Sequence, residues 1–212
     1  MTTDTTSVKT ITFRADEVRA ILRGSKTMTR LVVKPQPDDQ WPDAIECRWY
    51  SQTRIDQHGE QFPSEKVFGF ADEDSGWKCP FGGPGDRLWV RETWQSGEFA
   101  QNDPRGTVYR ATDPDWETCE GWRWRPSIHM PRWASRITLE VATVRVERLQ
   151  SITEEDALAE GAEFCGHGVE HDGRHYRCSF AAIWDRLNAK RPGCSWDSNP
   201  WIWVLSFRRI KP

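Results

Sequence analysis

A lysine and a threonine follow directly on what reads as the end of a helix. In the stretch ILRGSKTMTR, Gly24 stands where the helical pattern stops, and Lys26 and Thr29 come just after it. A threonine hydroxyl is a weak nucleophile that needs a nearby base, and a desolvated lysine can be one because burial disfavours its charge. These residues favour acyl transfer if a turn after Gly24 brings both side chains to one side. The alternative is a solvated lysine and a surface threonine.

A second feature is the segment GWRWRPSIHMPRWASR, which combines four arginines with three tryptophans and contains no acidic residue. Arginine and indole faces stack on nucleobases, and arginine also pairs with phosphate. The alternative is a tryptophan-rich edge of the core covered by arginines. From this segment we predict Trp124, Arg132 and Trp133 as substrate-binding residues. To them we add Arg30 and the strand-end carboxylate Glu92.

The loop CGHGVEHDGRHYRC could in principle bind metal. It contains Cys165, His167, His171, His175 and Cys178. Its spacing lacks the CxxC pair that accompanies HxxxH in common zinc sites. His171 and His175 are four residues apart, which suits a metal only on a helix, and Gly173 does not favour a helix there. We therefore predict a surface loop, with no metal and no cofactor.

Composition narrows the class of protein. The chain has 212 residues, a net charge of −3, thirteen tryptophans and six cysteines. A slightly acidic chain is not held to nucleic acid by bulk charge alone, although a local basic cleft remains open. Without a signal peptide, a long apolar run or a CxxC pair, we expect a cytoplasmic protein with free thiols and no membrane partner. Its oligomeric state is left open.

Strands and helices alternate without a regular βαβ rhythm, so the expected class is α+β. We expect a disordered lead-in at 1–10 and a single domain at 11–212. Loop-rich insertions with short strands are expected at about 36–78 and 96–121. ASRITLEVATVRVERL alternates with one change of phase, which predicts a strand with a bulge. SITEEDALAEG predicts a helix capped by Thr153, SFAAIWDRLNAK an amphipathic helix, and NPWIWVLSFRRI a closing strand.

The order of motifs resembles the ASCH-domain family of the PUA-like superfamily, in a form common among phage and prophage proteins. The resemblance rests on GSKTMTR, PGDRLWVRETW, the long strand with the helix after it, and the block from FAAIWDRLNAK to SFRRI. It implies a small β-barrel of mostly antiparallel strands flanked by helices. One departure is that the family arginine often stands two places after the second threonine, where this chain has Leu31.

One branch of that family acts as amidohydrolases on N4-acylated cytidine, with no cofactor. By this resemblance, the catalytic residues are Lys26, Thr29 and Glu160. Lysine and threonine provide base and nucleophile, while a glutamate can orient the lysine and carry a proton to the leaving amine. We therefore predict hydrolysis of the acyl group of N4-acetylcytidine or a similar nucleoside. The alternatives are an RNA-binding PUA-like module, with or without ribonuclease activity, which would bind single-stranded RNA, and a phage interaction protein without catalysis.

Overall fold

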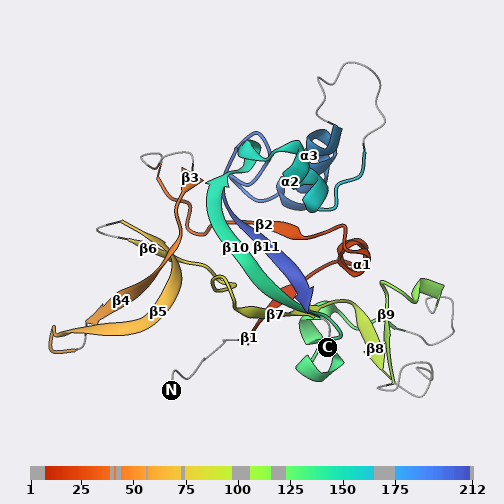
Figure 1. Ribbon diagram of the computed structural model, residues 1–212, viewed down its shortest axis with the longest axis horizontal. Coiled ribbons are helices and arrows are strands. Elements are labelled where there is room, and N and C mark those ends of the chain that lie inside the picture. Colours follow the sequence, from red (N-terminus) through yellow and green to blue (C-terminus); the bar gives the residue numbers. More distant parts are fainter. Residues whose placement is uncertain are drawn as a thin grey trace.

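The computed structural model shows a mixed α+β protein dominated by β-strands (Figure 1). It describes residues 8–38, 41, 44–55, 57–72, 75–96, 106–115, 123–164 and 175–210, with only the backbone at 52–55 and 61–65. Its strands are β1 (Val8–Thr12), β2 (Met28–Val32), β3 (Ala44–Ile45), β4 (Arg48–Ile55), β5 (Gln61–Ala71), β6 (Gly76–Lys78), β7 (Arg87–Arg91), β8 (Trp94–Ser96), β9 (Thr107–Tyr109), β10 (Thr138–Arg148) and β11 (Trp201–Ile210). Its helices are α1 (Ala15–Arg23), α2 (Glu154–Ala159), α3 (His175–Asn188) and the 3₁₀ turns η2 (Ser127–His129), η3 (Arg132–Ala134) and η4 (Leu149–Ser151).

The central sheet has the order β1-β7-β10-β11-β2, and β3 pairs with β10. The β1–β7 pair is parallel and the remaining pairs are antiparallel. In the described part of the chain the sheets do not close into a barrel, so the expected small β-barrel is not confirmed. β1 begins at Val8, inside the segment expected to be a lead-in, because its backbone pairs with β7 from Arg87 onward.

Strands β10 and β11 form the long antiparallel pair at the centre of Figure 1. The bulge expected from the phase change is confirmed, since the register shifts between Val141 and Thr143. Alternate residues of β11 enter two different cores. Trp203 and Leu205 belong to one core, whereas Val204 packs with the helical layer of α2 and α3. The last strand is therefore buried on both faces, as a continuous apolar run in the sequence allows.

The first insertion is more ordered than we expected. Its β4, β5 and β6 form a three-stranded sheet that extends away from the central sheet in Figure 1. Phe70 of β5 stacks on Trp77 of β6 at 4.9 Å and contacts Trp203 of β11 at 5.5 Å between ring centroids. These aromatic contacts attach the insertion to the central core. The sequence indicated only short strands within loops here, because this segment lacks regular alternation.

The helices agree with the sequence pattern in position and differ in detail. Thr153 caps α2 by accepting a hydrogen bond from the Asp156 amide, as predicted. α3 begins four residues earlier than the expected amphipathic segment. Leu187 is one of the apolar residues from which we predicted an amphipathic helix with an inward apolar face, but it is 42% exposed, at the cavity described below. None of the described helices is both long enough and apolar enough to cross a bilayer. The described cysteines are free thiols: Cys47, Cys79, Cys178 and Cys194.

Candidate active site

The turn after α1 determines where the lysine points. Gly24 adopts a left-handed conformation with φ of 81°, and its amide bonds back to the end of the helix. The amides of Ser25 and Lys26 both donate to the Ala20 carbonyl, at 3.0 and 3.2 Å. The turn that we expected after Gly24 is therefore present. The next amide, that of Thr27, donates to the Ala159 carbonyl at the end of α2, which joins the start of β2 to that helix.

Lys26 is buried and faces the end of α2, although 134 residues separate it from Glu160. Its Nζ donates to the Glu160 carbonyl oxygen and to Glu160 Oε2, both at 2.8 Å. Glu17 Oε1 on α1 lies 3.6 Å from the same nitrogen. Elements α1, β2 and α2 thus converge on a single ammonium group, because a buried cation requires acceptors around it.

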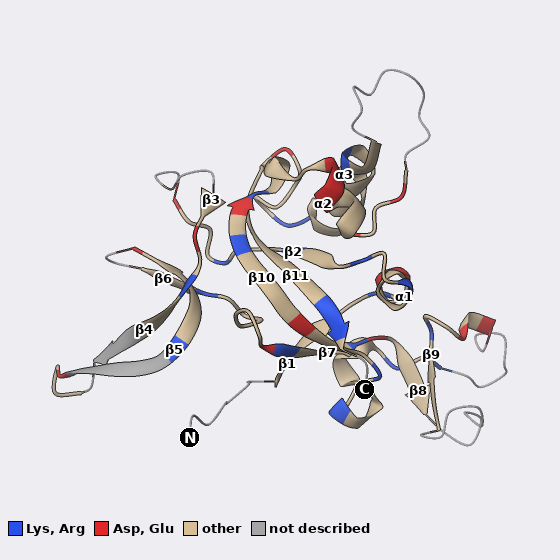
Figure 2. Cartoon of the chain, viewed as in Figure 1, with Lys and Arg blue, Asp and Glu red and all other residues tan. Residues whose placement is uncertain are grey.

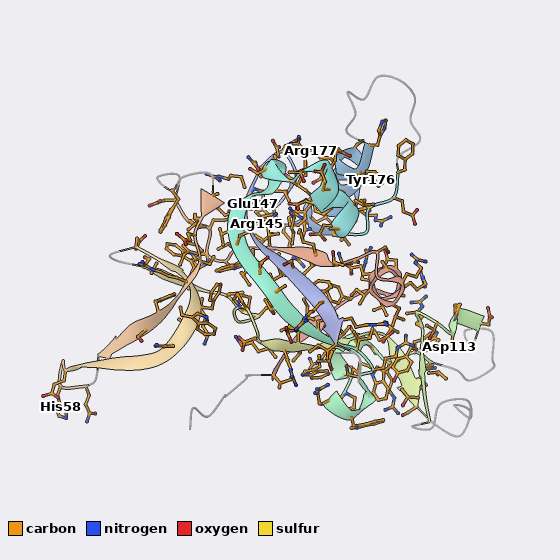
Figure 3. The ribbon with its side chains drawn as sticks, viewed as in Figure 1. His58, Asp113, Arg145, Glu147, Tyr176 and Arg177 are labelled. Atoms are coloured by element: carbon orange, nitrogen blue, oxygen red, sulfur yellow. The ribbon has the colours of Figure 1, made fainter. Side chains whose placement is uncertain are left out.

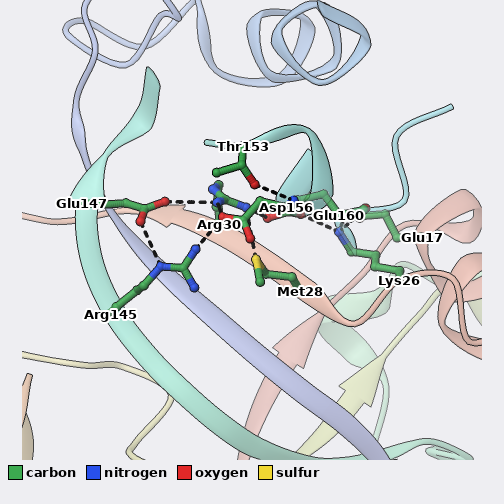
Figure 4. Close-up of polar contacts among 9 residues, drawn as sticks. All are labelled: Glu17, Lys26, Met28, Arg30, Arg145, Glu147, Thr153, Asp156 and Glu160. Atoms are coloured by element: carbon green, nitrogen blue, oxygen red, sulfur yellow. Dashed lines mark hydrogen bonds and ion pairs between the residues drawn. The ribbon is translucent and has the colours of Figure 1, made fainter. Parts of the chain in front are cut away.

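Arg30 holds the other side of Glu160 (Figure 4). Its side chain has no exposed surface, and its Nη1 donates to Glu160 Oε1 at 3.1 Å. Its Nη2 donates to Glu147 Oε1 at 3.1 Å and to Asp156. One oxygen of the Glu160 carboxylate is therefore bound by Lys26 and the other by Arg30.

Arg145 completes the cluster from β10. It lies next to Glu147 on that strand (Figure 3) and donates from Nε to Glu147 Oε2 at 2.9 Å. It also donates to Asp156, which it shares with Arg30. We call this set of side chains the ionic cluster, with the members Glu17, Lys26, Arg30, Arg145, Glu147, Asp156 and Glu160. Because its acids and bases alternate, each buried charge faces an opposite one.

Beside the ionic cluster lies a cavity of about 500 Å³, here called the first cavity. Lys26, Thr29 and Glu160 line it from one side, and Ile183 and Leu187 of α3 line it from another. Its volume is in the usual range for small-ligand sites. Thr29 is 6% exposed, and its hydroxyl has no hydrogen-bond partner among the residues that the structure describes. The three residues expected to be catalytic are thus brought together, with a free hydroxyl beside a lysine–glutamate pair.

The other sequence-predicted site residues lie elsewhere or are already engaged. Arg30 borders the first cavity but is occupied by three carboxylates, so it positions Glu160, and direct contact with substrate stays a prediction. Trp124, Arg132 and Trp133 do not line the first cavity. Trp133 is 56% exposed and contacts Trp94 edge-on, while the Arg132 guanidinium lies over the Trp89 ring at 5.7 Å.

Glu92 is buried in a bidentate ion pair rather than open to a ligand. Both of its carboxylate oxygens accept from Arg136 at 2.9 Å. Burial raises the pKa of the Glu92 carboxyl, and Arg136 opposes that shift. The Arg136 guanidinium also lies 3.9 Å from the Tyr109 ring centroid. Since Glu92 does not border the first cavity, this geometry favours a structural role over the predicted substrate contact.

The structure adds residues that sequence reasoning did not select. Asp156 belongs to the acidic first turn of α2, which Figure 2 shows in red, and an acid there is favourable for any helix. Glu147 and Arg145 appeared only as members of an alternating strand. The available signal was their charge within the resembling block, but nothing in the sequence linked them to Arg30, more than a hundred residues away.

The histidine–cysteine loop falls mostly outside the described residues. His175 and Cys178 lie in the first turns of α3. Cys165, His167 and His171 are not among the described residues. No group of three metal-ligating side chains occurs in the part of the chain that the structure describes. The expectation that the loop binds no metal stays a prediction.

No protein-family model matches the chain, and neither does a curated protein or a solved structure. The resemblance to the ASCH family therefore rests on the sequence motifs and stays a prediction.

Proposed function

We propose that the protein is an ASCH-type amidohydrolase, on a PUA-like scaffold, that removes the acyl group from N4-acylated cytidine or a similar modified nucleoside. One observation carries this proposal. The unpartnered Thr29 hydroxyl shares a cavity with a lysine whose ammonium is bound by a buried glutamate. A nucleophile, a proton-transfer group and an orienting carboxylate in one small cavity are the parts that acyl transfer requires.

The reaction can be written with every proton placed. Lys26 passes a proton to Glu160 and accepts the proton of the attacking hydroxyl. Thr29 Oγ bonds to the acyl carbon, the carbon–nitrogen bond breaks, and the cytidine N4 leaves as the amine with the proton from Lys26. Water then gives a proton to Lys26 and attacks the Thr29 ester. Lys26 returns that proton to Thr29 Oγ as the carboxylic acid is released, and Glu160 returns its proton to Lys26. In the alternative mechanism without an acyl-enzyme ester, water is the nucleophile and Thr29 orients it.

The first test is hydrolysis of N4-acetylcytidine, followed by chromatography of cytidine and acetate. Thr29→Val keeps the volume of the side chain and removes the hydroxyl, so we expect a loss of roughly 10²–10⁴-fold in kcat/KM. Thr29→Ser restores the hydroxyl and should retain most activity. The matched control is Thr27→Val, because Thr27 is exposed and does not line the first cavity. If wild-type protein releases no cytidine from acetyl, propionyl or benzoyl substrates, the proposal fails.

The runner-up function is binding of single-stranded RNA by the arginine–tryptophan segment. It is favoured by the exposed indole of Trp133, which stands beside exposed Arg132. Exposed aromatic and guanidinium groups suit base stacking and phosphate pairing. This function predicts that Trp133→Ala weakens binding of a short RNA and leaves nucleoside hydrolysis unchanged, which fluorescence anisotropy and the hydrolysis assay together decide.

A further inference from the structure

A second cavity of about 660 Å³ adjoins the first cavity. Both are lined by the same four side chains: Arg14, Asp16, Arg19 and Arg186. These residues come from the start of α1 and from α3, so the two cavities meet along one ridge between those helices. A ligand seated over Thr29 can therefore extend across the ridge into the second cavity.

Positive charge exceeds negative charge on this ridge. Of the residues that the structure describes, Asp16 is the only acidic one that lines the second cavity, and it accepts a hydrogen bond from Arg14 Nη2 at 2.8 Å. Among the described residues, no carboxylate pairs with Arg19 or Arg186. Arg19 is directed by its Nη1, which donates to the Ala111 carbonyl at 3.3 Å. The guanidinium groups of Arg19 and Arg186 therefore remain available to a ligand, whereas the one acidic residue of the ridge, Asp16, is already paired with Arg14.

The acidic residues that line the first cavity do not cancel this excess of positive charge. Glu17 and Glu160 face Lys26. Glu163 is a further acidic residue of this lining. Arg23 is a further arginine of the lining, and it pairs with no carboxylate among the described residues. In a protein whose net charge is −3, two adjoining cavities with unpaired guanidinium groups form a local site for an anion.

We propose that Arg19 and Arg186 bind a phosphate of the substrate, so that the substrate is a nucleotide rather than a free nucleoside. This inference rests on the proposed function, because it places the acylated base over Thr29 and the phosphate on the ridge. A guanidinium matches a phosphate with paired, charge-assisted hydrogen bonds, which accounts for arginine rather than lysine here. The phosphate is either that of a mononucleotide or a phosphodiester within RNA.

The test compares cytidine 5′-monophosphate with cytidine by isothermal titration calorimetry at low salt. We expect the monophosphate to bind at least about tenfold more tightly, because only this ligand can accept charge-assisted hydrogen bonds from the two guanidinium groups. In Arg19→Gln and Arg186→Gln, the affinity ratio between the two ligands should fall toward one. The matched control is Arg48→Gln on β4, an exposed arginine that lines neither cavity, and it should keep the wild-type ratio.

The dinucleotide adenylyl-(3′→5′)-cytidine, whose phosphodiester is on the 5′ oxygen of cytidine, distinguishes the source of the phosphate. Binding like that of the monophosphate assigns the ridge to a phosphodiester, and binding like that of cytidine assigns it to a terminal phosphate. Equal affinity for cytidine and its monophosphate would overturn the inference, as would failure of both to bind or a wild-type ratio in the two arginine variants.

The two proposals fail separately. If N4-acetylcytidine and its 5′-monophosphate are both hydrolysed at the same kcat/KM, the phosphate site is wrong and the proposed function stands. If neither is hydrolysed while the monophosphate still binds through Arg19 and Arg186, the phosphate site stands and the amidohydrolase is wrong.

Discussion

At the scale of single residues, the Glu160 carboxylate is the centre of the candidate site. Lys26 binds one of its oxygens and Arg30 binds the other, so its orientation is set by two cations on either side. Arg30 is in turn fixed by Glu147 and Asp156. In the proposed reaction, a carboxylate held in this way would keep its geometry while it transfers a proton, which is the condition for efficient general acid–base catalysis.

The contribution of Arg30 to stability is open to measurement. Arg30→Met removes the cation and leaves three carboxylates without it, so we expect a loss of about 3–5 kcal/mol in the free energy of unfolding. Arg30→Lys should lose less, because it keeps the charge without the two-pronged donor. Urea unfolding followed by tryptophan fluorescence measures both.

The comparison variant is Arg208→Met, which removes an ion pair with Glu140 from a side chain that is 73% exposed. An exposed pair contributes about 0–1 kcal/mol, so that variant should remain close to wild type. Equal stability of the Arg30 and Arg208 variants would show that the ionic cluster is not what holds β2 to α2.

The members of the candidate site were predictable to different degrees. Lys26 and Thr29 could be selected from local chemistry, and Glu160 from the resemblance. The role of Arg30 could not, because its partners Glu147 and Asp156 lie 117 and 126 residues away in the sequence. An ion pair between distant segments leaves no periodic signal in the sequence, whereas a helix cap or a turn does.

At the scale of elements, local sequence patterns were sufficient to predict helix ends and a strand bulge where capping residues or alternation were clear. α1 ends at a glycine, α2 begins at a capping threonine, and β10 carries its bulge where the alternation changes phase. In the first insertion we expected only short strands, and the length and pairing of β4 and β5 were not predicted, because the segment lacks regular alternation between apolar and polar residues. Its contacts come from aromatic side chains such as Phe70, which meet their partners only in the folded protein.

The turn after α1 gives a prediction at this scale. Gly24→Ala should lower the free energy of unfolding by about 1 kcal/mol, because φ is +81° while an added Cβ would meet no atom within 4 Å. Gly85→Ala is the matched control, with φ of +91° and the same open space away from the first cavity. Urea unfolding should give similar losses for both variants.

The same pair of variants separates stability from function. Gly24→Ala changes the turn that aims Lys26, so it should lower hydrolysis of N4-acetylcytidine more than Gly85→Ala does. Equal activity of the two variants, or no loss of stability in Gly24→Ala, would show that this turn does not depend on its left-handed glycine.

At the scale of the whole molecule, β11 joins the two halves of the central sheet. It lies between β10 and β2, and Ile202, Val204 and Leu205 have no exposed surface. Beyond β11, β2 has no other strand partner in the described sheet. Without this strand, both cores that it fills would be open to water.

A chain that ends at Pro200 should therefore fail to fold. We expect far-ultraviolet circular dichroism without the native strand signal, and rapid hydrogen exchange at the amides of β10 and β2. The full chain measured under the same conditions is the reference. Slow exchange at β10 in the shortened chain would contradict the central role of β11, because it would mean that β7 and β10 hold together alone.

The position of β11 also bears on how the protein is made. Lys26 is synthesised 134 residues before the glutamate that binds it, and β11 follows later still. At roughly 5–20 residues per second, Glu160 is synthesised on the order of ten seconds after Lys26. The candidate site can then assemble only after β11 has been synthesised. An mRNA truncated before the codons of β11 would produce a polypeptide that does not fold. Its tryptophans would be exposed to chaperones and proteases.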